Sequence, residues 1–237
     1  MALVTSLRFA PNQVFDGARH RLDLVAHSYL KKVDNCPSDL SPVAVTADGN
    51  CLYNSMVLLI NDPTIGVAEL RGLSLAYPVL ASITWFAVVR VIMELTRNER
   101  FYESLHMASL GPVHIALKTI SKNYSYSESY EIHALCNVLG CNIQSFCPSI
   151  GLHPNVLPML NKLFTPIAPQ NVECTIRILW CHTMMETDVK ISNRGHWSPN
   201  HFVPLVSNGT SVGSDNGSTQ PIMKVLFVRE RFPVTNF

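Results

Sequence analysis

The sequence predicts an α+β domain, because helical patterns come first along the chain and strand patterns come later. Before residue 140, apolar side chains recur at the three- and four-residue spacing of a buried helix face. After residue 140, short segments alternate apolar and polar side chains, as half-buried strands do. No internal repeat is visible, so a solenoid or a propeller is not expected.

Two of the expected helices have identifiable ends. The apolar run from Cys51 to Ile60 stops at Asn61-Asp62-Pro63, where proline prevents the helix from continuing. A capping-box pattern from Ser125 to Glu128 begins the last helix, and Gly140 ends it. The predicted helices cover residues 18–31, 51–60, 90–105, 112–122 and the segment between the capping box and Gly140.

Strands are expected where short apolar runs lie between turn residues. The segment Cys174–Trp180 is the clearest of them, because Ile176, Ile178 and Trp180 fall on one face. Residues 207–221, rich in Gly, Ser and Asn, are expected to form a flexible hairpin loop between the last two strands. The predicted strands cover residues 42–46, 141–146, 174–180, 201–206 and 222–228.

The composition excludes two classes of protein. With 47 % hydrophobic residues the chain is not intrinsically disordered, and with 18 basic and 17 acidic side chains it is not a polybasic nucleic-acid binder. Only 15 % of its residues are charged, and the uncharged run 72–89 accounts for part of that low value. Pro78, Gly72 and the hydroxyl side chains of this run favour a buried segment over a membrane span. We therefore expect neither nucleic-acid nor membrane binding.

The cysteines favour free thiols. There are seven, without a Cys-x-x-Cys pair, and the N-terminal residues lack the apolar core of a signal peptide. A reducing compartment, cytoplasmic or nuclear, is therefore expected. Cys174, Cys181 and His182 are the best zinc candidates, but they lack the paired spacing of a tetrahedral site, so no metal is expected.

The most informative segment is Asp48-Gly49-Asn50-Cys51, directly before an apolar helix. A cysteine at a helix N-terminus lies near unpaired backbone N–H groups and the positive end of the macrodipole, which lowers a thiol pKa and favours the thiolate. The N–H groups of the same loop would surround a developing oxyanion. From these four residues alone, a buried and inert cysteine after a tight turn is an equally good interpretation.

A thiolate nucleophile needs a base, and His201 is the best candidate among nine histidines. It lies in the alternating segment 200–205, far downstream of Cys51, as a cysteine and a histidine that meet in space require. His196, in the preceding turn, is the second choice.

Three blocks resemble the OTU (ovarian-tumour) family of papain-like cysteine proteases. Thr46–Tyr53 resembles the nucleophile motif, and Glu131–Leu135 with Leu139–Ile143 resembles the middle helix-to-strand segment. Asn200–Phe202 resembles the strand that carries the catalytic histidine. The resemblance implies a small, mostly antiparallel sheet flanked by helices. It also implies a thiol-dependent deubiquitinase that cleaves (iso)peptide bonds at the C-terminal glycine of ubiquitin or a ubiquitin-like protein, without a cofactor.

By the same resemblance, Cys51 is the nucleophile, His201 the general base and Asp48 a further catalytic residue. The loop Asp48, Gly49, Asn50 and Cys51 corresponds to the oxyanion hole. Many members carry Asp or Asn two residues after the histidine, where this chain has Val203. Other members use an upstream acid. The candidates for orienting the histidine are Asn200, Asp16, Asp23, Asp34 and Asp39.

A ubiquitin tail is extended and apolar, so Trp197 and Phe202 are expected to line the substrate cleft. Residues 1–40 are predicted to be a partly helical N-terminal extension and 41–230 the OTU-like domain, acting as a monomer. Within this domain we expect residues 72–89 to be an insertion relative to the family. If they were removed, the segment ending at Arg71 would continue directly into the helix that begins at Arg90. The alternative function is a catalytically impaired OTU-like binding module, as in a vertnin-like or mobile-element protein.

Overall fold

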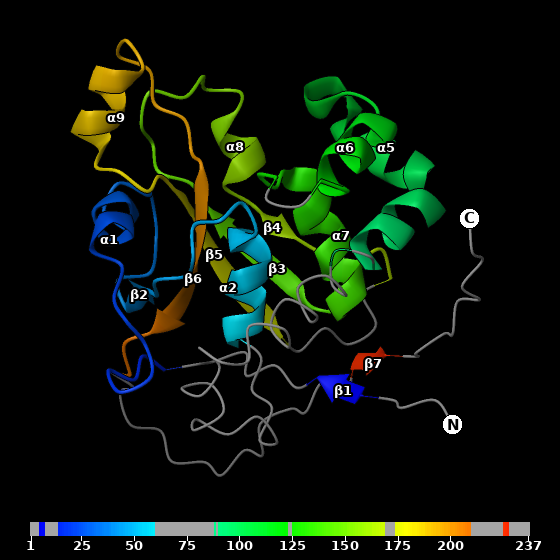
Figure 1. Cartoon of the computed structure of the whole chain (residues 1–237), viewed down its shortest axis with the longest axis horizontal. Coiled ribbons are helices and arrows are strands. Elements are labelled where there is room, and N and C mark those ends of the chain that lie inside the picture. The colour runs from blue at the N-terminus through cyan, green and yellow to red at the C-terminus, as the bar shows by residue number, and fades with distance from the viewer. Residues whose placement is uncertain are drawn as a thin grey trace.

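The fold is taken from a computed structural model, which describes residues 5–7, 14–59, 88, 90–122, 125–168, 174–209 and 225–227. A sheet stands at the centre of the described residues, with helices on both of its faces (Figure 1). The α+β prediction is confirmed.

The central sheet has five strands in the order β2-β6-β5-β3-β4. Three of the four neighbouring pairs are antiparallel, and only β3 and β5 run parallel. The sheet is therefore mostly antiparallel, as predicted. Its strands are β2 (Leu40–Pro42), β3 (Asn142–Phe146), β4 (Leu163–Phe164), β5 (Thr175–Cys181) and β6 (His201–Ser207).

A second pairing lies apart from the central sheet. Strand β1 (Thr5–Leu7) pairs antiparallel with β7 (Val225–Phe227). The strand predicted at 222–228 is therefore present, but its described partner is β1 and not β6.

Each predicted helical segment is helical in part, but the helices Leu157–Leu160 and Glu186–Ser192 lie outside all of them, and the helix that begins at Glu99 extends beyond residue 105. The segment predicted at 90–105 is helical at 90–97 and again from Glu99, with Asn98 between the two parts. The named helices are α1 (Leu24–Leu30), α2 (Cys51–Leu59), α5 (Glu99–Leu110), α6 (Val113–Ile120), α7 (Ser129–Leu139), α8 (Leu157–Leu160) and α9 (Glu186–Ser192).

Helix α7 has the predicted kind of cap, one turn later than predicted. The capping box is formed by Glu128 and Glu131, and not by Ser125 and Glu128. The Glu128 backbone N–H donates to Glu131 Oε2 at 2.6 Å, which satisfies a donor that the first helical turn would leave unpaired. Gly140 ends the helix in the left-handed region at φ +62°, as its position predicts.

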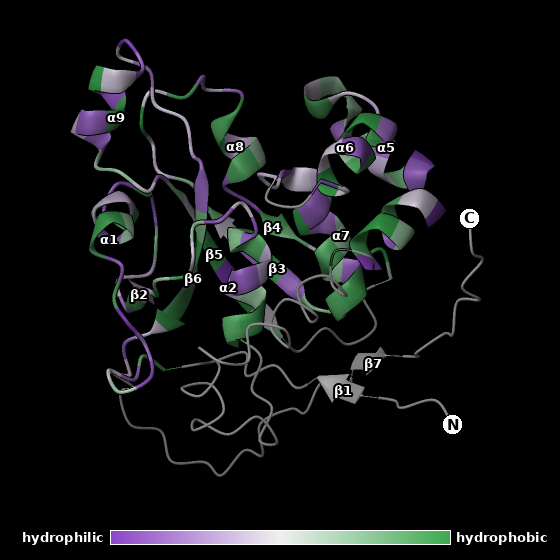
Figure 2. Cartoon of the chain, viewed as in Figure 1, coloured by the Kyte–Doolittle hydropathy of each residue, from purple (hydrophilic) through white to green (hydrophobic). Residues whose placement is uncertain are grey.

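The two faces of the sheet bury different cores, because successive side chains of a strand point to opposite sides. On β6, Phe202 and Val206 belong to the core shared with α2 and α7, whereas Val203 and Leu205 belong to the core shared with α1 and α9. Figure 2 shows apolar colouring on the lower half of β6 and mixed colouring on α9. Helix α1 thus packs on the sheet, although it precedes the predicted domain boundary at residue 41.

Two predicted segments lie mostly outside the described residues. Of 72–89 only residue 88 is described, where a buried valine joins the first core. Of the loop 207–221 only 207–209 are described. Among the described helices, none has the length and hydropathy of a membrane span.

Candidate active site

Cys51 is the first residue of α2, as the sequence predicts. The loop before it turns at Gly49, which has φ +82°. Asp48 closes this loop through one oxygen, Oδ1. That atom accepts the Asn50 backbone N–H at 2.9 Å and the Asn54 Nδ2–H at 3.0 Å. The first role of Asp48 in this structure is therefore to fix the turn that presents Cys51.

The sulfur of Cys51 lies beside the first residues of β6. The Phe202 backbone N–H donates to Cys51 Sγ at 3.3 Å, so the sulfur is next to the peptide bond that follows His201. The Ser55 hydroxyl strengthens this junction, because it donates to the Cys51 carbonyl at 2.7 Å and lies 3.5 Å from the Phe202 carbonyl. Two segments separated by 150 residues of sequence are thus held together, as the resemblance requires.

The thiol is not activated in this conformation. The Cys51 residue is only 1 % exposed, and burial raises the pKa of its thiol to about 11, although the N–H groups of Phe202 and Leu52 act in the opposite direction. The prediction that the helix N-terminus lowers this pKa is wrong here, because loss of water outweighs the helix end. Within the described part of the chain, no hydrogen bond joins Cys51 Sγ to the His201 ring.

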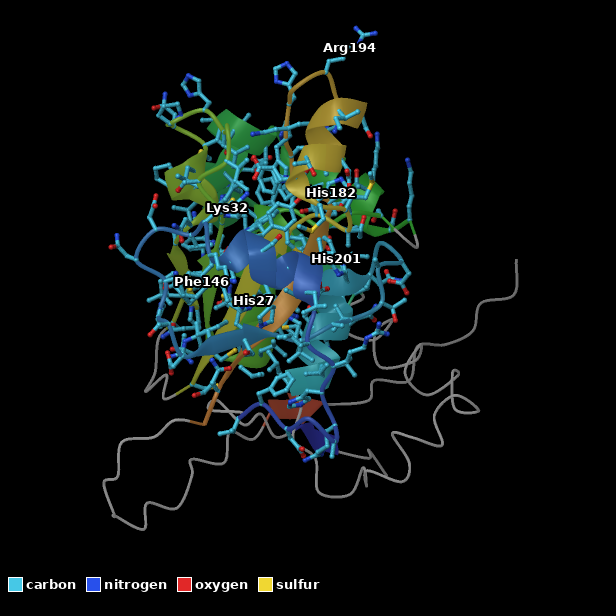
Figure 3. All side chains as sticks on the ribbon, turned by 90° about the vertical axis from the view of Figure 1, so that its left-hand side faces the viewer. His27, Lys32, Phe146, His182, Arg194 and His201 are labelled. Atoms are coloured by element: carbon cyan, nitrogen blue, oxygen red, sulfur yellow. The ribbon has the colours of Figure 1, made fainter. Side chains whose placement is uncertain are left out.

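His201 lies at the start of β6 and is 3 % exposed. Burial lowers the pKa of its imidazole, the negative charges of Asp23 and Asp48 raise it, and His182 lowers it further. Its Nδ1 atom is buried and has no hydrogen-bond partner among the described residues. Figure 3, which looks onto α1, shows His182 and His201 near one end of this helix.

One candidate for orienting His201 uses its side-chain oxygen elsewhere, and the family position two residues after the histidine carries no polar side chain. Asn200 directs its Oδ1 to the Thr183 backbone N–H, from which it accepts at 3.1 Å. Val203 is fully buried in the core beneath α1 and carries no polar atom in its side chain. The family position two residues after the histidine therefore supplies no partner for the imidazole.

The four upstream acids lie in different places. Asp34 accepts from the Ser149 hydroxyl, Asp39 from the Ser207 hydroxyl, and Asp16 from the Ala18 backbone N–H. Asp23 caps α1, where its Oδ1 accepts the Ala26 backbone N–H at 2.8 Å. Of the four, only Asp23 is among the charges that act on His201.

Trp197 and Phe202, predicted to line a substrate cleft, lie in the interior instead. Phe202 is 0 % exposed and contacts Trp180 and Tyr126, with ring centroids 4.3 and 5.3 Å away. Trp197 is buried against Tyr29, with ring centroids 5.5 Å apart. The prediction is wrong for this structure, because both rings fill the core.

His196, the second choice for the base, is exposed in the turn after α9.

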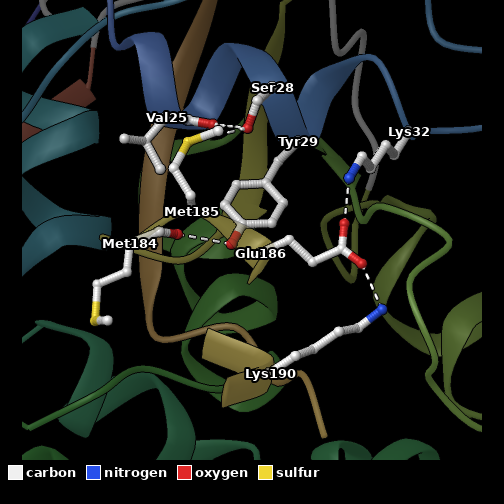
Figure 4. Close-up of polar contacts among 8 residues, drawn as sticks. All are labelled: Val25, Ser28, Tyr29, Lys32, Met184, Met185, Glu186 and Lys190. Carbon is white, nitrogen blue, oxygen red and sulfur yellow. Dashed lines mark hydrogen bonds and ion pairs between the residues drawn. The ribbon is translucent and has the colours of Figure 1, made fainter. Parts of the chain in front are cut away.

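Sequence reasoning missed a set of contacts that ties the loop after β5 to α1 (Figure 4). The Tyr29 hydroxyl donates to the Met184 carbonyl at 2.7 Å, and the Ser28 hydroxyl lies 3.8 Å from Met185 Sδ. Glu186 then forms ion pairs with Lys32 and, at 2.5 Å, with Lys190. We name residues 182–186 the β5–α9 loop. Glu186 and Lys190 are a local i,i+4 pair, but no local pattern reveals the other three contacts, because their partners are more than 150 residues apart.

The zinc candidates are not a metal site in this structure. Cys174 directly precedes β5, whereas Cys181 is its last residue. Across the described residues, no group of three or more His, Cys, Asp or Glu side chains could hold a metal ion.

Comparisons with known proteins give three findings. The profile of the family described as "Vertnin, OTU domain" matches residues 111–181. Vertnin of Danio rerio is 24 % identical over 220 residues, which cover 86 % of this chain and 31 % of that relative. The solved structure described as the OTUD1 OTU domain aligns with a TM-score of 0.41 and 13 % identity, covering 80 % of this chain and 98 % of that chain.

The matched segment runs from just before α6 to the last residue of β5. It contains Glu131–Leu135 and Leu139–Ile143, on which part of the predicted resemblance rests, but neither Cys51 nor His201. The chain spans less than a third of the length of Vertnin, so the comparison says nothing about the rest of that protein. The predicted resemblance is confirmed over residues 111–181, which match the model of an OTU domain family.

Proposed function

We propose that this chain is a thiol-dependent deubiquitinase, which hydrolyses (iso)peptide bonds at the C-terminal glycine of ubiquitin or a ubiquitin-like protein. The observation that carries the proposal is the junction of Cys51 and β6, where the Phe202 backbone N–H donates to Cys51 Sγ at 3.3 Å, one residue after His201. A nucleophile at a helix N-terminus next to a histidine on a neighbouring strand is the arrangement that acyl transfer through a thiol needs.

In the proposed reaction, His201 takes the proton of Cys51 and the sulfur attacks the glycine carbonyl carbon. The carbonyl oxygen becomes an oxyanion, which accepts hydrogen bonds from the backbone N–H groups of the loop before α2. His201 then gives its proton to the departing lysine amine, and water hydrolyses the thioester. No metal or organic cofactor takes part.

The structure described above is a resting form of this site. A neutral thiol with a pKa of about 11 is a poor nucleophile at neutral pH, and both reacting residues are buried. Substrate binding must therefore admit the tail and bring the His201 ring to the sulfur. In that complex the imidazolium would stabilise the thiolate, which lowers the thiol pKa.

Asp23 is the proposed orienting acid for His201. Its charge acts on the imidazole from the end of α1, and its Oδ1 is used by Ala26 N–H, so Oδ2 is the oxygen left for Nδ1–H. The buried Nδ1 needs such a partner to hold one tautomer. In the serine-protease template, loss of the orienting carboxylate costs about 10⁴-fold in kcat.

The test uses ubiquitin with a thiol-reactive group in place of its C-terminal carboxylate. The expected result is a covalent adduct of the full chain that is lost in Cys51→Ala and in His201→Ala, with Cys147→Ala as the matched control. Circular dichroism verifies that each variant is folded. A folded chain that forms no adduct, or an adduct on another cysteine, would overturn the proposal.

Asp23→Asn tests the orienting role without removing the helix cap, because Asn caps a helix as well as Asp does. We expect slower adduct formation by at least about tenfold, an unchanged melting temperature and a lower His201 pKa by NMR. Asp39→Asn is the control and should change none of these. Unchanged adduct formation in Asp23→Asn contradicts the role of Asp23 and leaves the proposed function standing.

A second candidate is a module that binds ubiquitin or another protein without cleaving it. The observation that favours it is that His201 Nδ1 has no hydrogen-bond partner among the described residues, while the Cys51 thiol is buried and its pKa is raised to about 11. Binding of unmodified ubiquitin to the wild type and to Cys51→Ala, measured by calorimetry, separates the two. Equal binding together with no adduct favours the module.

A further inference from the structure

Cys141 and Cys174 lie side by side at the entry to the two parallel strands. The first registered pair of β3 and β5 is Asn142 with Thr175, so the cysteines occupy the position directly before it. The Asn142 backbone N–H donates to the Cys174 carbonyl at 3.0 Å, which extends the pairing to this position. Both side chains belong to the same core, on the same face as Ile143 and Ile176.

This placement matches the requirements of a disulfide. Neighbouring strands lie about 4.7–4.9 Å apart. Disulfides join residues whose Cα atoms are about 4.4–6.8 Å apart and whose side chains point toward each other. Paired positions of parallel strands point to the same face, so the two sulfur atoms lie on the same side of the sheet.

The two thiols also differ chemically. A hydrogen bond from the Cys141 thiol lowers the pKa of Cys174, and Arg177 acts in the same direction against the effect of burial. The pKa of Cys141 is raised, first by the same hydrogen bond and then by burial. The thiol pKa of each of the other cysteines is raised, first by burial: Cys36, Cys51, Cys136, Cys147 and Cys181.

We propose that Cys141 and Cys174 are an oxidant-sensitive thiol pair, which hydrogen peroxide converts into a disulfide across β3 and β5. The Cys174 thiolate attacks one peroxide oxygen, the O–O bond breaks, and the other oxygen leaves as water after protonation. The resulting sulfenic acid is attacked by the sulfur of Cys141, which forms the S–S bond and releases a second water. Peroxide is reduced, and the two thiols are oxidised.

This site is separate from the proposed hydrolase site. It uses neither Cys51 nor His201, and its test does not depend on cleavage of ubiquitin. A thiol of lowered pKa next to a resolving thiol is one of the features of a redox-sensitive cysteine.

The experiment exposes the folded full chain to graded hydrogen peroxide, blocks the remaining thiols with N-ethylmaleimide and maps the peptides by mass spectrometry. We expect a cross-linked peptide pair containing Cys141 and Cys174, about 2 Da lighter than the sum of its reduced parts. Cys36 is the control for exposure, because it is more accessible but its thiol pKa is about 11. Cys147 is the control for a buried thiol whose pKa is raised by burial.

Two variants assign the roles. In Cys141→Ser, dimedone should trap a sulfenic acid on Cys174, because the resolving thiol is absent. In Cys174→Ser, Cys141 should remain reduced at the same peroxide concentration. The proposal is overturned if Cys36 oxidises completely before any Cys141–Cys174 cross-link forms, or if Cys174 pairs with another cysteine.

Discussion

The backbone N–H of Phe202 donates to the sulfur of Cys51 at 3.3 Å, and this contact joins the two halves of the candidate active site. It connects the first residue of α2 to the second residue of β6. Because Phe202 is also a fully buried core residue, the position of the sulfur depends on the packing of the sheet. The nucleophile is therefore fixed by the core and by the turn before it.

Asp48→Ala should destabilise the fold through that turn. The substitution removes the carboxylate oxygen that accepts from the Asn50 N–H and from the Asn54 amide, which keeps only its 3.3 Å contact with the Thr46 carbonyl. The expected loss is about 1–2 kcal/mol in the free energy of unfolding, measured by chemical denaturation. Asp34→Ala, which removes an acceptor from an exposed contact, is the control. If the two variants lose the same free energy of unfolding, the turn at Asp48 contributes no more to stability than an exposed surface contact does.

Alkylation of Cys51 should report its raised thiol pKa. With a pKa of about 11, the rate with iodoacetamide should rise about tenfold for each pH unit between pH 7 and 10. The rate is followed on the peptide that contains Cys51, with Cys51→Ser to verify the assignment. A rate that is already constant near pH 7 would mean that the thiolate forms readily in the free protein.

Glu131→Gln should stabilise the protein at alkaline pH. Burial raises the pKa of this carboxyl to about 8 from its ordinary 4.5, so the folded state keeps a proton that the unfolded chain loses. The free energy of unfolding of the wild type should therefore fall as the pH rises from about 5 to about 8. Gln carries no charge and also serves in a capping box.

The expected gain for Glu131→Gln is on the order of 2–4 kcal/mol at pH 8 and close to zero at pH 4. Urea denaturation over this pH range measures it, with the exposed Glu99→Gln as the control. If the free energy of unfolding has the same pH dependence in the wild type and in Glu131→Gln, the Glu131 carboxyl ionises in the folded state without destabilising it.

Tyr29→Phe should destabilise the protein more than Lys32→Met does, although both residues contact the β5–α9 loop. The Tyr29 ring is buried, and its hydroxyl donates to the Met184 carbonyl at 2.7 Å, so its loss should cost about 1 kcal/mol. Lys32 pairs with Glu186 at the surface, where such pairs contribute about 0–1 kcal/mol.

Thermal denaturation at low and at high salt separates the Tyr29 and Lys32 contributions. Only the difference between Lys32→Met and the wild type should shrink as salt increases, because salt screens the exposed ion pair. A salt-dependent loss in Tyr29→Phe would mean that the hydroxyl acts through the neighbouring charges.

Much of the fold was predictable because its signals are local. The Cys51–Leu59 helix follows from an apolar run, and the end of α7 follows from a glycine that adopts φ +62°. The alternation in β5 likewise identifies a strand. The capping box of α7 was predicted one turn early, because Ser125 and Glu128 have the right spacing and only the backbone decides which pair is used.

By itself, the sequence determined the α+β class, the family resemblance and the choice of Cys51 and His201, because residue type, order and spacing are sufficient for these. Tertiary structure decided how deeply those residues are buried and which charges lie near them. It buried Cys51 and raised its thiol pKa, enclosed Phe202 and Trp197 in the core, and brought the charge of Asp23 to His201. Desolvation and Coulomb interactions depend on distances between segments far apart in the chain, and no local pattern contains those distances.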